Sequence, residues 1–360
     1  MDSQQRSRYV ELLRDYIVVG FGIAGLCFCE HLERNSKSFI VFDDDSQQSS
    51  WVAGGMYNPV ILKRFTLAWN AVSQQEFALP FYRSLEAKLN ESFLVPLKVY
   101  RKFASIEEQN LWFEAMDKPQ MDQFMSSKIL QNENPHVKAS YGFGQLDGVG
   151  RLKVRNLITA YRKRLEAMNS FVFEQFDFDQ LQFQDNVVSY KGYKAKQIVF
   201  ATGYGLKSNP LFKELPLQGT KGELVLIEAA DLKLEAILKA GVFLLPLGDD
   251  RYYVGATYNW NDKTNKPSEK AKKELLSKLD KLIDGPYKVI DHIAGIRPTV
   301  IDRRPLVGRH LEIQNAYVLN GMGTRGVLVA PTLSKQLYEY IEEGSALDLE
   351  IDVQRFYNKA

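Results

Sequence analysis

The pattern of apolar positions is most informative near the start of the chain, where two short apolar runs flank a helical segment. The runs at 16–19 and 39–42 are rich in β-branched and aromatic residues, as buried parallel strands are. Between them, residues up to about Arg34 carry apolar side chains at helical spacing. The pattern therefore predicts a strand, a helix and a second strand in this order.

Three glycines stand between the first strand and the helix, in the sequence GFGIAG. In such a turn Gly20 makes the tight bend, Gly22 lets the backbone approach a pyrophosphate, and Gly25 lets the helix lie close to the strand. The second strand ends on Asp43, whose carboxylate can accept both hydroxyls of a ribose. This arrangement is the dinucleotide-binding fingerprint, and the alternative is a glycine turn that binds no ligand.

The rest of the chain alternates between helical and strand-like patterns. Helices are expected over 67–89, 152–168, 270–283 and 327–342, and one or two helices interrupted at Pro119 over 106–125. Strands are expected over 93–104, 171–178, 180–183, 187–190, 197–200, 219–228, 289–293 and 316–319, with two more in 242–257. Residues 44–60 and 131–140 read as loops, with Asp44 and Asp45 as solvated acids, and 142–150 is rich in glycine.

A second glycine loop, NGMGTRGV, follows the predicted strand at 316–319 and opens the last predicted helix. It would present another set of helix N-terminal N–H groups to a ligand. A nicotinamide dehydrogenase needs one such loop, whereas FAD carries an anionic pyrophosphate and, when reduced, negative charge on its ring. Two loops therefore favour FAD, and the alternative is a glycine that only caps a helix.

Composition limits the class of protein. The chain has 360 residues, of which 45% are hydrophobic, and this suffices for two domains or one large interleaved unit. The net charge of +2 gives no electrostatic footprint for nucleic acid or for an acidic membrane. The lysines of 270–281 alternate with acids and are interpreted as a solvated helix face.

Targeting signals are not evident in the sequence. The N-terminal segment lacks the apolar stretch of a signal peptide, and no apolar run approaches the length that spans a bilayer, so a cytoplasmic location is expected. Cys27 and Cys29 would point to different faces of the first helix and are expected to pack as small apolar residues. No metal site is expected.

Six motifs occur in an order and spacing that resemble the D-amino-acid oxidase family of flavoenzymes, with glycine oxidase and sarcosine oxidase as the nearest types. They are GFGIAG, SSWVAGGM, IVFATG, GIRP, DRRPLVGRH and NGMGTRGVLVAP. The resemblance implies an α/β and α+β fold with a discontinuous, Rossmann-like FAD-binding domain at 14–62, 141–215 and 297–345. A substrate-binding domain built on a large antiparallel sheet would comprise 63–140 and 216–296.

The resemblance also implies which residues bind FAD, and the binding is expected to be non-covalent because no cysteine lies near the later motifs. Gly20, Gly22 and Gly25 would hold the pyrophosphate, and Asp43 the adenosine ribose. The remaining FAD contacts would come from Ser50, Gly54, Gly55 and Met56 beside the ribityl chain and ring, the backbone of Phe178 at the adenine, Ala201, Thr202 and Gly203 packed on the cofactor, and Gly321, Gly323, Thr324 and Arg325 at the pyrimidine end.

Two residues are implied to contact the substrate. Arg297 resembles the family arginine that binds the substrate carboxylate, which suits a guanidinium fork that can donate two parallel hydrogen bonds. Its alternative role is a structural ion pair at a strand end. Tyr258 occupies a pocket-lining position of the family, and its alternative role is a core aromatic.

Two positions depart from the family pattern and make the expected pocket less polar. Phe243 stands where a tyrosine often helps to hold the carboxylate, and Met322 stands where glycine oxidase has a histidine. Glycine itself is therefore not favoured as the substrate.

The sequence thus predicts an FAD-dependent enzyme that oxidises the C–N bond of an amino acid or secondary amine by hydride transfer to the flavin. One alternative is the oxidase type that modifies the wobble uridine of tRNA, and another is a nicotinamide-dependent dehydrogenase. A third is a binding or scaffold protein that retains FAD without turnover. The expected partners are a small amine or amino acid and an electron acceptor, either oxygen or a quinone.

Overall fold

The computed structural model describes residues 13–357, which divide into two compact units. The first unit combines the chain up to Trp51 with Arg155–Thr220 and the part from Ile296 onward. The second unit combines Val52–Val154 with Lys221–Gly295. The N-terminal segment examined for a signal peptide lies largely outside the described residues.

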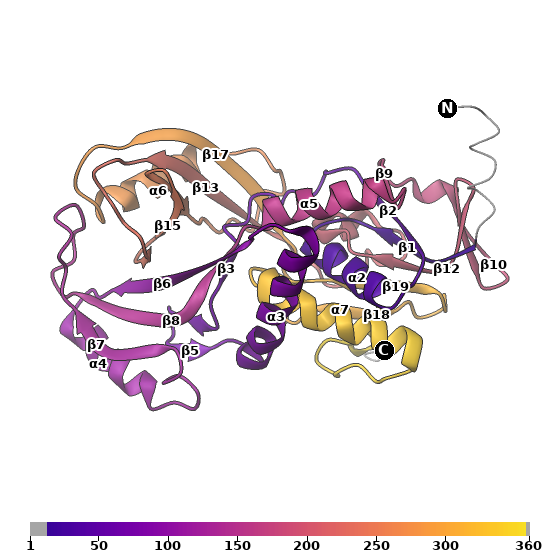
Figure 1. Ribbon diagram of the computed structural model, residues 1–360, viewed down its shortest axis with the longest axis horizontal. Coiled ribbons are helices and arrows are strands. Elements are labelled where there is room, and N and C mark those ends of the chain that lie inside the picture. Colours follow the sequence, from indigo (N-terminus) through magenta and orange to yellow (C-terminus); the bar gives the residue numbers. More distant parts are fainter. Residues whose placement is uncertain (1–12, 358–360) are drawn as a thin grey trace. The chain divides into compact units, whose positions relative to one another are not determined.

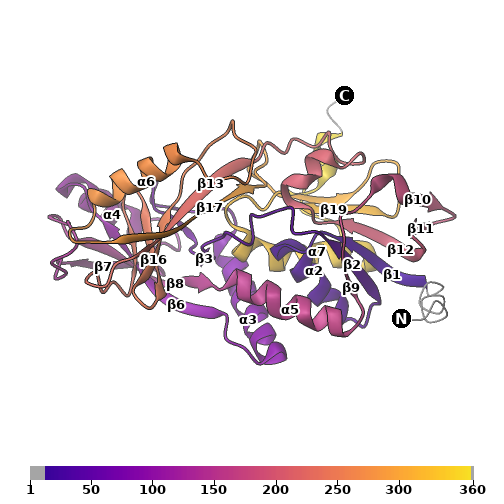
Figure 2. The ribbon, with the colours of Figure 1, turned by 90° about the horizontal axis from the view of Figure 1, so that it is seen from above.

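The first unit is built on a sheet that is eight-stranded within the described residues (Figures 1 and 2). Its main path runs β10-β11-β12-β1-β2-β9, and β19 pairs with β12 and β18. The central strands β9, β2, β1, β12 and β19 are parallel to one another, whereas β11 and β18 pair antiparallel with β12 and β19. The elements are β1 (Leu13–Val19), α2 (Ile23–Arg34), β2 (Phe39–Asp43), α5 (Val154–Ala167), β9 (Phe171–Phe173), η1 (Phe178–Gln180), β10 (Leu181–Gln184), β11 (Val187–Tyr190), β12 (Tyr193–Phe200), η2 (Gly203–Ser208), β18 (Leu306–Arg309), β19 (Ala316–Asn320), α7 (Gly326–Glu343) and η3 (Val353–Phe356).

Successive side chains of β1 lie on opposite faces of the sheet, and both faces are buried. The ring of Tyr16 meets Phe28 of α2 edge-on, with 5.6 Å between ring centroids. Ile17 and Val19 point to the opposite face, into a core that also contains Phe200. Successive side chains of a strand face opposite sides, so a strand covered on both sides must be apolar throughout, as this one is.

The second unit contains a nine-stranded sheet among the described residues, in the order β17-β13-β16-β15-β14-β6-β8-β3, with β7 beside β8. Most neighbours are antiparallel, while β14 and β6 are parallel. Its elements are β3 (Met56–Tyr57), β4 (Val60–Ile61), β5 (Thr66–Leu67), α3 (Ala71–Leu89), β6 (Leu94–Lys102), α4 (Ile106–Met116), β7 (Met125–Leu130), β8 (Phe143–Leu152), β13 (Thr220–Glu228), β14 (Ile237–Lys239), β15 (Phe243–Gly248), β16 (Arg251–Gly255), α6 (Glu269–Asp280) and β17 (Lys288–Arg297). The predicted fold class is confirmed: one unit is α/β and the other carries a large, mainly antiparallel sheet.

Several elements differ from the predicted pattern, and packing explains two of the differences. No element was predicted for the glycine-rich stretch 142–150, but Phe143–Leu152 form the strand β8, in which a Cβ atom at Gly144 would come 2.7 Å from Phe103 and Trp112. The strand expected over 171–178 ends at Phe173, because Phe176 turns inward and stacks on Tyr190 with ring centroids 4.1 Å apart. Strands β7, β14 and β18 were not predicted, and the helix predicted over 106–125 ends at Met116.

The division between the units also differs from the predicted domain boundaries. Residues 52–62 and 141–154 were assigned to the FAD-binding domain but lie in the second unit. The reason is strand pairing, since β3 pairs with β8 and β8 pairs with β6. The assignment of FAD and substrate to the two units stays a prediction.

Candidate functional site

The first glycine loop joins β1 to α2, and its glycines are required by close backbone contacts. Gly20 has φ +96°, and a Cβ atom there would lie 2.6 Å from the carbonyl oxygen of Ala201. At Gly25 a Cβ atom would lie 2.1 Å from the carbonyl oxygen of Gly20. Ala201 also donates its backbone N–H to Val19 at 2.7 Å. The loop therefore lies directly against the Ala201–Gly203 segment, which was predicted to contact the same cofactor.

Ser50 lies at the N-terminus of α2. Its Oγ accepts the backbone N–H of Ile23 at 3.1 Å, and a Cβ atom at Gly22 would lie 2.9 Å from this oxygen. Gly22 is the residue that precedes the helix. The structure thus places Ser50 beside the helix start where a phosphate would bind.

The second glycine loop is tied to the same segment. Asn320, at the end of β19, donates its Nδ2 to the carbonyl oxygen of Gly203 at 3.0 Å and accepts the N–H of Gly321 at 2.7 Å. Helix α7 then runs beside α2, as Figures 1 and 2 show, and a Cβ atom at Gly326 would lie 3.0 Å from Ile23. The starts of the two helices therefore lie close together in the first unit.

Arg297 ends β17 and is attached to this loop through the backbone. The carbonyl oxygen of the next residue, Pro298, accepts the N–H of Gly323 at 3.0 Å. Arg297 itself is partly buried. In the loop, burial lowers the pKa of Arg325 to about 10, because desolvation penalises its charged form. Within this unit, Arg325 thus lies in the second glycine loop, and Arg297 is next to the residue whose carbonyl oxygen binds that loop; Thr324 of the loop is exposed.

Asp43 lies at the end of β2 with both carboxylate oxygens engaged. Oδ1 accepts the N–H of Phe21 at 3.1 Å, and Oδ2 accepts from Arg162 at 3.2 Å. Burial raises the pKa of Asp43 to about 6, and the negative charge of Asp45 adds to this rise. The Phe21 N–H and the Arg162 guanidinium act in the opposite direction. Each carboxylate oxygen can accept a second hydrogen bond, so Asp43 can still bind ribose hydroxyls.

The residues of the first unit fit FAD. The hydroxyl of Thr202 is buried and has no hydrogen-bond partner among the described residues. A buried polar group without a partner is rare, and here it stands in the segment that contacts Gly20. Phe178 lies in η1 rather than in a strand, and its ring stacks on Phe200 with centroids 5.9 Å apart. The side chain of Phe178 therefore belongs to the core, which leaves its backbone for the predicted adenine contact.

Four predicted site residues lie in the second unit: Gly54, Gly55, Met56 and Tyr258. A Cβ atom at Gly55 would lie 1.9 Å from the carbonyl oxygen of Leu152, so Gly55 is already required by packing inside this unit. A Cβ atom at Gly54 would lie 3.1 Å from Leu245 and 4.0 Å from Phe243. Tyr258 is 63% exposed, so the alternative that it is a core aromatic is wrong. The predicted place of these residues beside the flavin stays a prediction.

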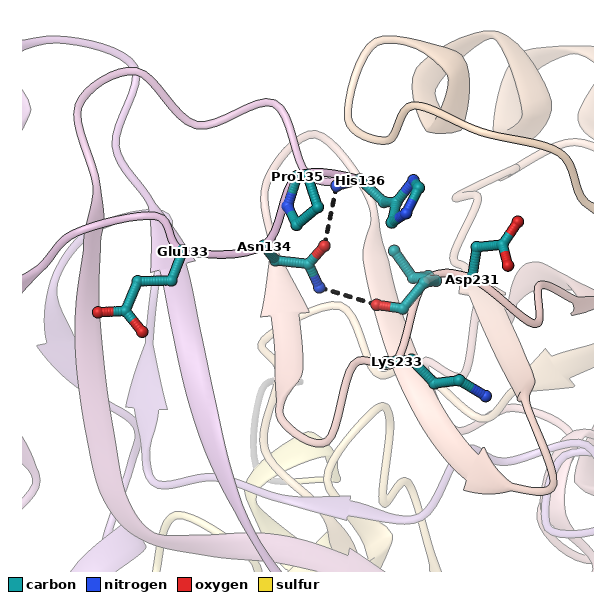
Figure 3. A pocket seen from close by; sticks show the side chains of 7 residues that line it. Glu133, Asn134, Pro135, His136, Asp231 and Lys233 are labelled. Carbon is teal, nitrogen blue, oxygen red and sulfur yellow. Dashed lines mark hydrogen bonds between the residues drawn. The ribbon is translucent and has the colours of Figure 1, made fainter.

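An open surface pocket of about 450 Å³ lies elsewhere on the second unit (Figure 3). It is formed by the loops at 133–136 and 231–233, and Asn134 joins them by donating to the carbonyl oxygen of Leu232 at 2.8 Å. His136 and Lys233 also line it. None of the predicted site residues contributes to this pocket, so it is separate from the cofactor motifs.

Three residues near the motifs were not predicted. Asp45 was interpreted as a solvated loop acid, but it forms a two-point ion pair with Arg162. The position of Asp45, two residues after Asp43, could have indicated this role. Arg162 stands in the basic run RKR on α5, and nothing in the sequence distinguishes it there. Asn320 connects two motifs, and its place directly before the second glycine loop could have indicated this role.

Two features of the described residues bear on the class of protein. Of the helices in residues 13–357, none combines the length and the apolar character that crossing a bilayer requires. Within the same residues, no group of three or more histidine, cysteine, aspartate or glutamate side chains is arranged to hold a metal ion.

Comparison with known proteins gives consistent results at the level of family and fold. The family model described as FAD dependent oxidoreductase (DAO) matches residues 15–340. The glycine oxidase of Pseudomonas putida is 23% identical over 362 residues, which cover 92% of this chain and 95% of that protein. The crystal structure of glycine oxidase from Geobacillus kaustophilus has a TM-score of 0.77 at 20% identity and covers 93% of this chain and 96% of that chain.

A different relative has a higher identity over a shorter stretch. The tRNA 5-methylaminomethyl-2-thiouridine biosynthesis bifunctional protein MnmC of Nitrosospira multiformis is 30% identical over 175 residues. These residues cover 44% of this chain and 28% of that protein.

Proposed function

Because this chain belongs to the FAD-dependent oxidoreductase (DAO) family, we propose that it oxidises the C–N bond of an amino acid or a secondary amine. The glycines of the two loops and Asp43 would hold FAD without a covalent link, and the flavin would supply the acceptor for the hydride that leaves the substrate carbon. Oxygen or a quinone would take up the two electrons. A cytoplasmic location is part of the same proposal.

The observation that carries the substrate part of the proposal is the hydrogen bond from Gly323 to Pro298. It ties the residue after Arg297 to the second glycine loop, which is expected to face the pyrimidine end of the flavin. An arginine attached to this loop by one peptide unit would supply the cation that a substrate carboxylate needs. The glycine oxidases among the relatives, which match over nearly their full length, support the same substrate class.

The chain's own residues would act by binding and orientation. Arg297 would donate two parallel hydrogen bonds to the substrate carboxylate and so hold the substrate in one pose. The neutral amine nitrogen provides the electron pair that forms the C=N bond as hydride leaves the adjacent carbon. Water then hydrolyses the imine product, and no protein acid or base has to change its protonation state for the hydride step.

An anaerobic titration of the FAD-loaded protein with a panel of amines and amino acids tests the proposal. A substrate should bleach the visible flavin absorbance. In R297M the concentration needed for half-bleaching by a carboxylate-bearing substrate should rise about 10- to 100-fold, as expected for losing a charge-assisted pair. R303M, which removes an exposed arginine from the same segment, should behave as wild type.

Bleaching by no member of the panel would contradict the amine oxidation. A wild-type response in R297M would contradict only the role of Arg297. Reoxidation rates measured with oxygen and with a soluble quinone would distinguish the two acceptors, and cell fractionation would test the location.

A second candidate is oxidation of a modified uridine in tRNA. It is favoured by the 30% identity to the MnmC protein, although this chain spans 28% of that protein in the match. The net charge of +2 offers little attraction to a polyanion. Bleaching of the flavin by tRNA that carries a carboxymethylaminomethyl uridine, but by no free amino acid, would favour this candidate over the first.

A further inference from the structure

Arg162 belongs to none of the cofactor motifs, yet it reaches the end of β2. Its Nη1 donates to Oδ2 of Asp45 at 2.8 Å, and its Nη2 donates to Oδ2 of Asp43 at 3.2 Å. The side chains of Arg162 and Asp43 are only 14% and 13% exposed. A largely buried cation on α5 therefore joins two acids at the strand end beside the first glycine loop.

Aromatic rings fix the guanidinium from its other sides. The ring centroids of Trp51, Phe171 and Phe173 lie 5.2, 4.9 and 5.8 Å from its central carbon. Cations are attracted to aromatic faces, and more strongly where water is excluded. The rings therefore restrict Arg162 to the pose in which its fork faces the acids.

The two acids share the positive charge of one guanidinium, that of Arg162. Asp43 and Asp45 are close enough that each affects the ionisation of the other, and the Arg162 guanidinium holds the pKa of Asp45 below its usual range. The charges of Asp45 and Arg162 act on Asp43, and Glu166 on α5 acts on Arg162. Without Arg162, two neighbouring carboxylates in a poorly solvated place could not both stay ionised, so Asp43 would take up a proton more readily.

We propose that Arg162 is a positioning residue of the FAD site, which neutralises Asp45 and thereby keeps Asp43 ionised and oriented for the ribose hydroxyls. This inference rests on the proposed role of Asp43 in binding the adenosine ribose. An ionised carboxylate accepts hydrogen bonds from both hydroxyls, whereas a protonated one has lost part of that capacity. FAD affinity should therefore follow the protonation of Asp43.

The test is the dissociation constant of FAD, measured by flavin fluorescence on the apoprotein between pH 5 and 8. In the wild type the constant should rise as the pH falls through about 6, where Asp43 gains its proton. In R162M the midpoint of this rise should move to higher pH, with affinity at neutral pH about tenfold lower. In D45N the midpoint should move to lower pH, because the negative charge next to Asp43 is gone while Arg162 remains.

Shifts in opposite directions separate this role from a structural one. A residue that only supports the fold would weaken FAD binding equally at every pH, in both variants. R162K keeps the charge and should restore most of the wild-type midpoint, and the shift in D45N serves as the test if R162M does not fold. Midpoints that stay in place, or that move the same way in the two variants, would overturn the role of Arg162.

D43N distinguishes this inference from the assignment on which it rests. It should bind FAD weakly and without a pH dependence over this range. Wild-type affinity in D43N would overturn the ribose role of Asp43, and with it the role of Arg162. Weak, pH-independent binding in D43N together with an unmoved R162M midpoint would overturn the role of Arg162 alone.

Discussion

Replacing Gly25 by alanine should displace the first glycine loop by about 1 Å. The added Cβ atom would lie 2.1 Å from the carbonyl oxygen of Gly20, while real Cβ contacts essentially never fall below 3.0 Å. The contact is with backbone, so no side chain can rotate to relieve it. Either α2 or the turn at Gly20 must move, and the turn is itself held against Ala201.

The size of the effect follows from two opposing contributions. Overpacking of this kind costs about 1–3 kcal/mol, and alanine in a helix recovers up to about 1 kcal/mol relative to glycine. We therefore expect a net loss of up to about 2 kcal/mol in the free energy of unfolding. FAD affinity should fall about tenfold or more, because the displaced loop is the one that would hold the pyrophosphate.

Urea denaturation and FAD titration by fluorescence measure the two effects separately. G326A is the matched control, since Gly326 is also a glycine in the first turn of a helix, and there the new Cβ atom would meet side chains rather than backbone, with Ile23 at 3.0 Å and Met322 at 3.6 Å. G326A should stay near wild type in both assays. A G25A variant with wild-type stability and wild-type FAD affinity would refute the reasoning.

Two further predictions concern stability. Burial lowers the pKa of His31 to about 4, so His31 stays neutral in the folded protein at pH values where the unfolded chain is protonated there. The free energy of unfolding should therefore fall by about 1–3 kcal/mol as the pH drops from 6.5 to 4. In urea denaturation, H31Q should lose less stability over this range. An equal loss in H31Q would contradict the assignment of this titration to His31. S50A leaves the Ile23 N–H without its acceptor and should lower the free energy of unfolding of the apoprotein by about 1 kcal/mol. S46A, at an exposed serine of the same loop, should have little effect. Equal urea midpoints for the two variants would show that the Ser50 hydrogen bond does not stabilise the fold.

Local patterns predicted the elements whose residues interact mainly with near neighbours in the chain. The unit from β1 to β2, the two strands in 242–257 and helices α6 and α7 follow the pattern closely, because each has a strong period of its own. The glycine spacing also located the loops that the structure joins around Ala201. Strand β8 was missed because its glycines are required by tertiary contacts, such as that of Gly144 with Phe103 and Trp112, which no local pattern records.

The sequence by itself determined the strand–glycine–helix unit, the second glycine loop and the family, since each depends on residue types at short, fixed spacings. Only the tertiary structure decided that Asn320 joins the second glycine loop to Gly203, that Gly55 packs against Leu152, and that Arg162 joins Asp43 to Asp45. These contacts link segments up to 119 residues apart, as for Arg162 and Asp43. A hydrogen bond or ion pair depends on where the folded backbone places two side chains, and their separation along the chain does not encode that position.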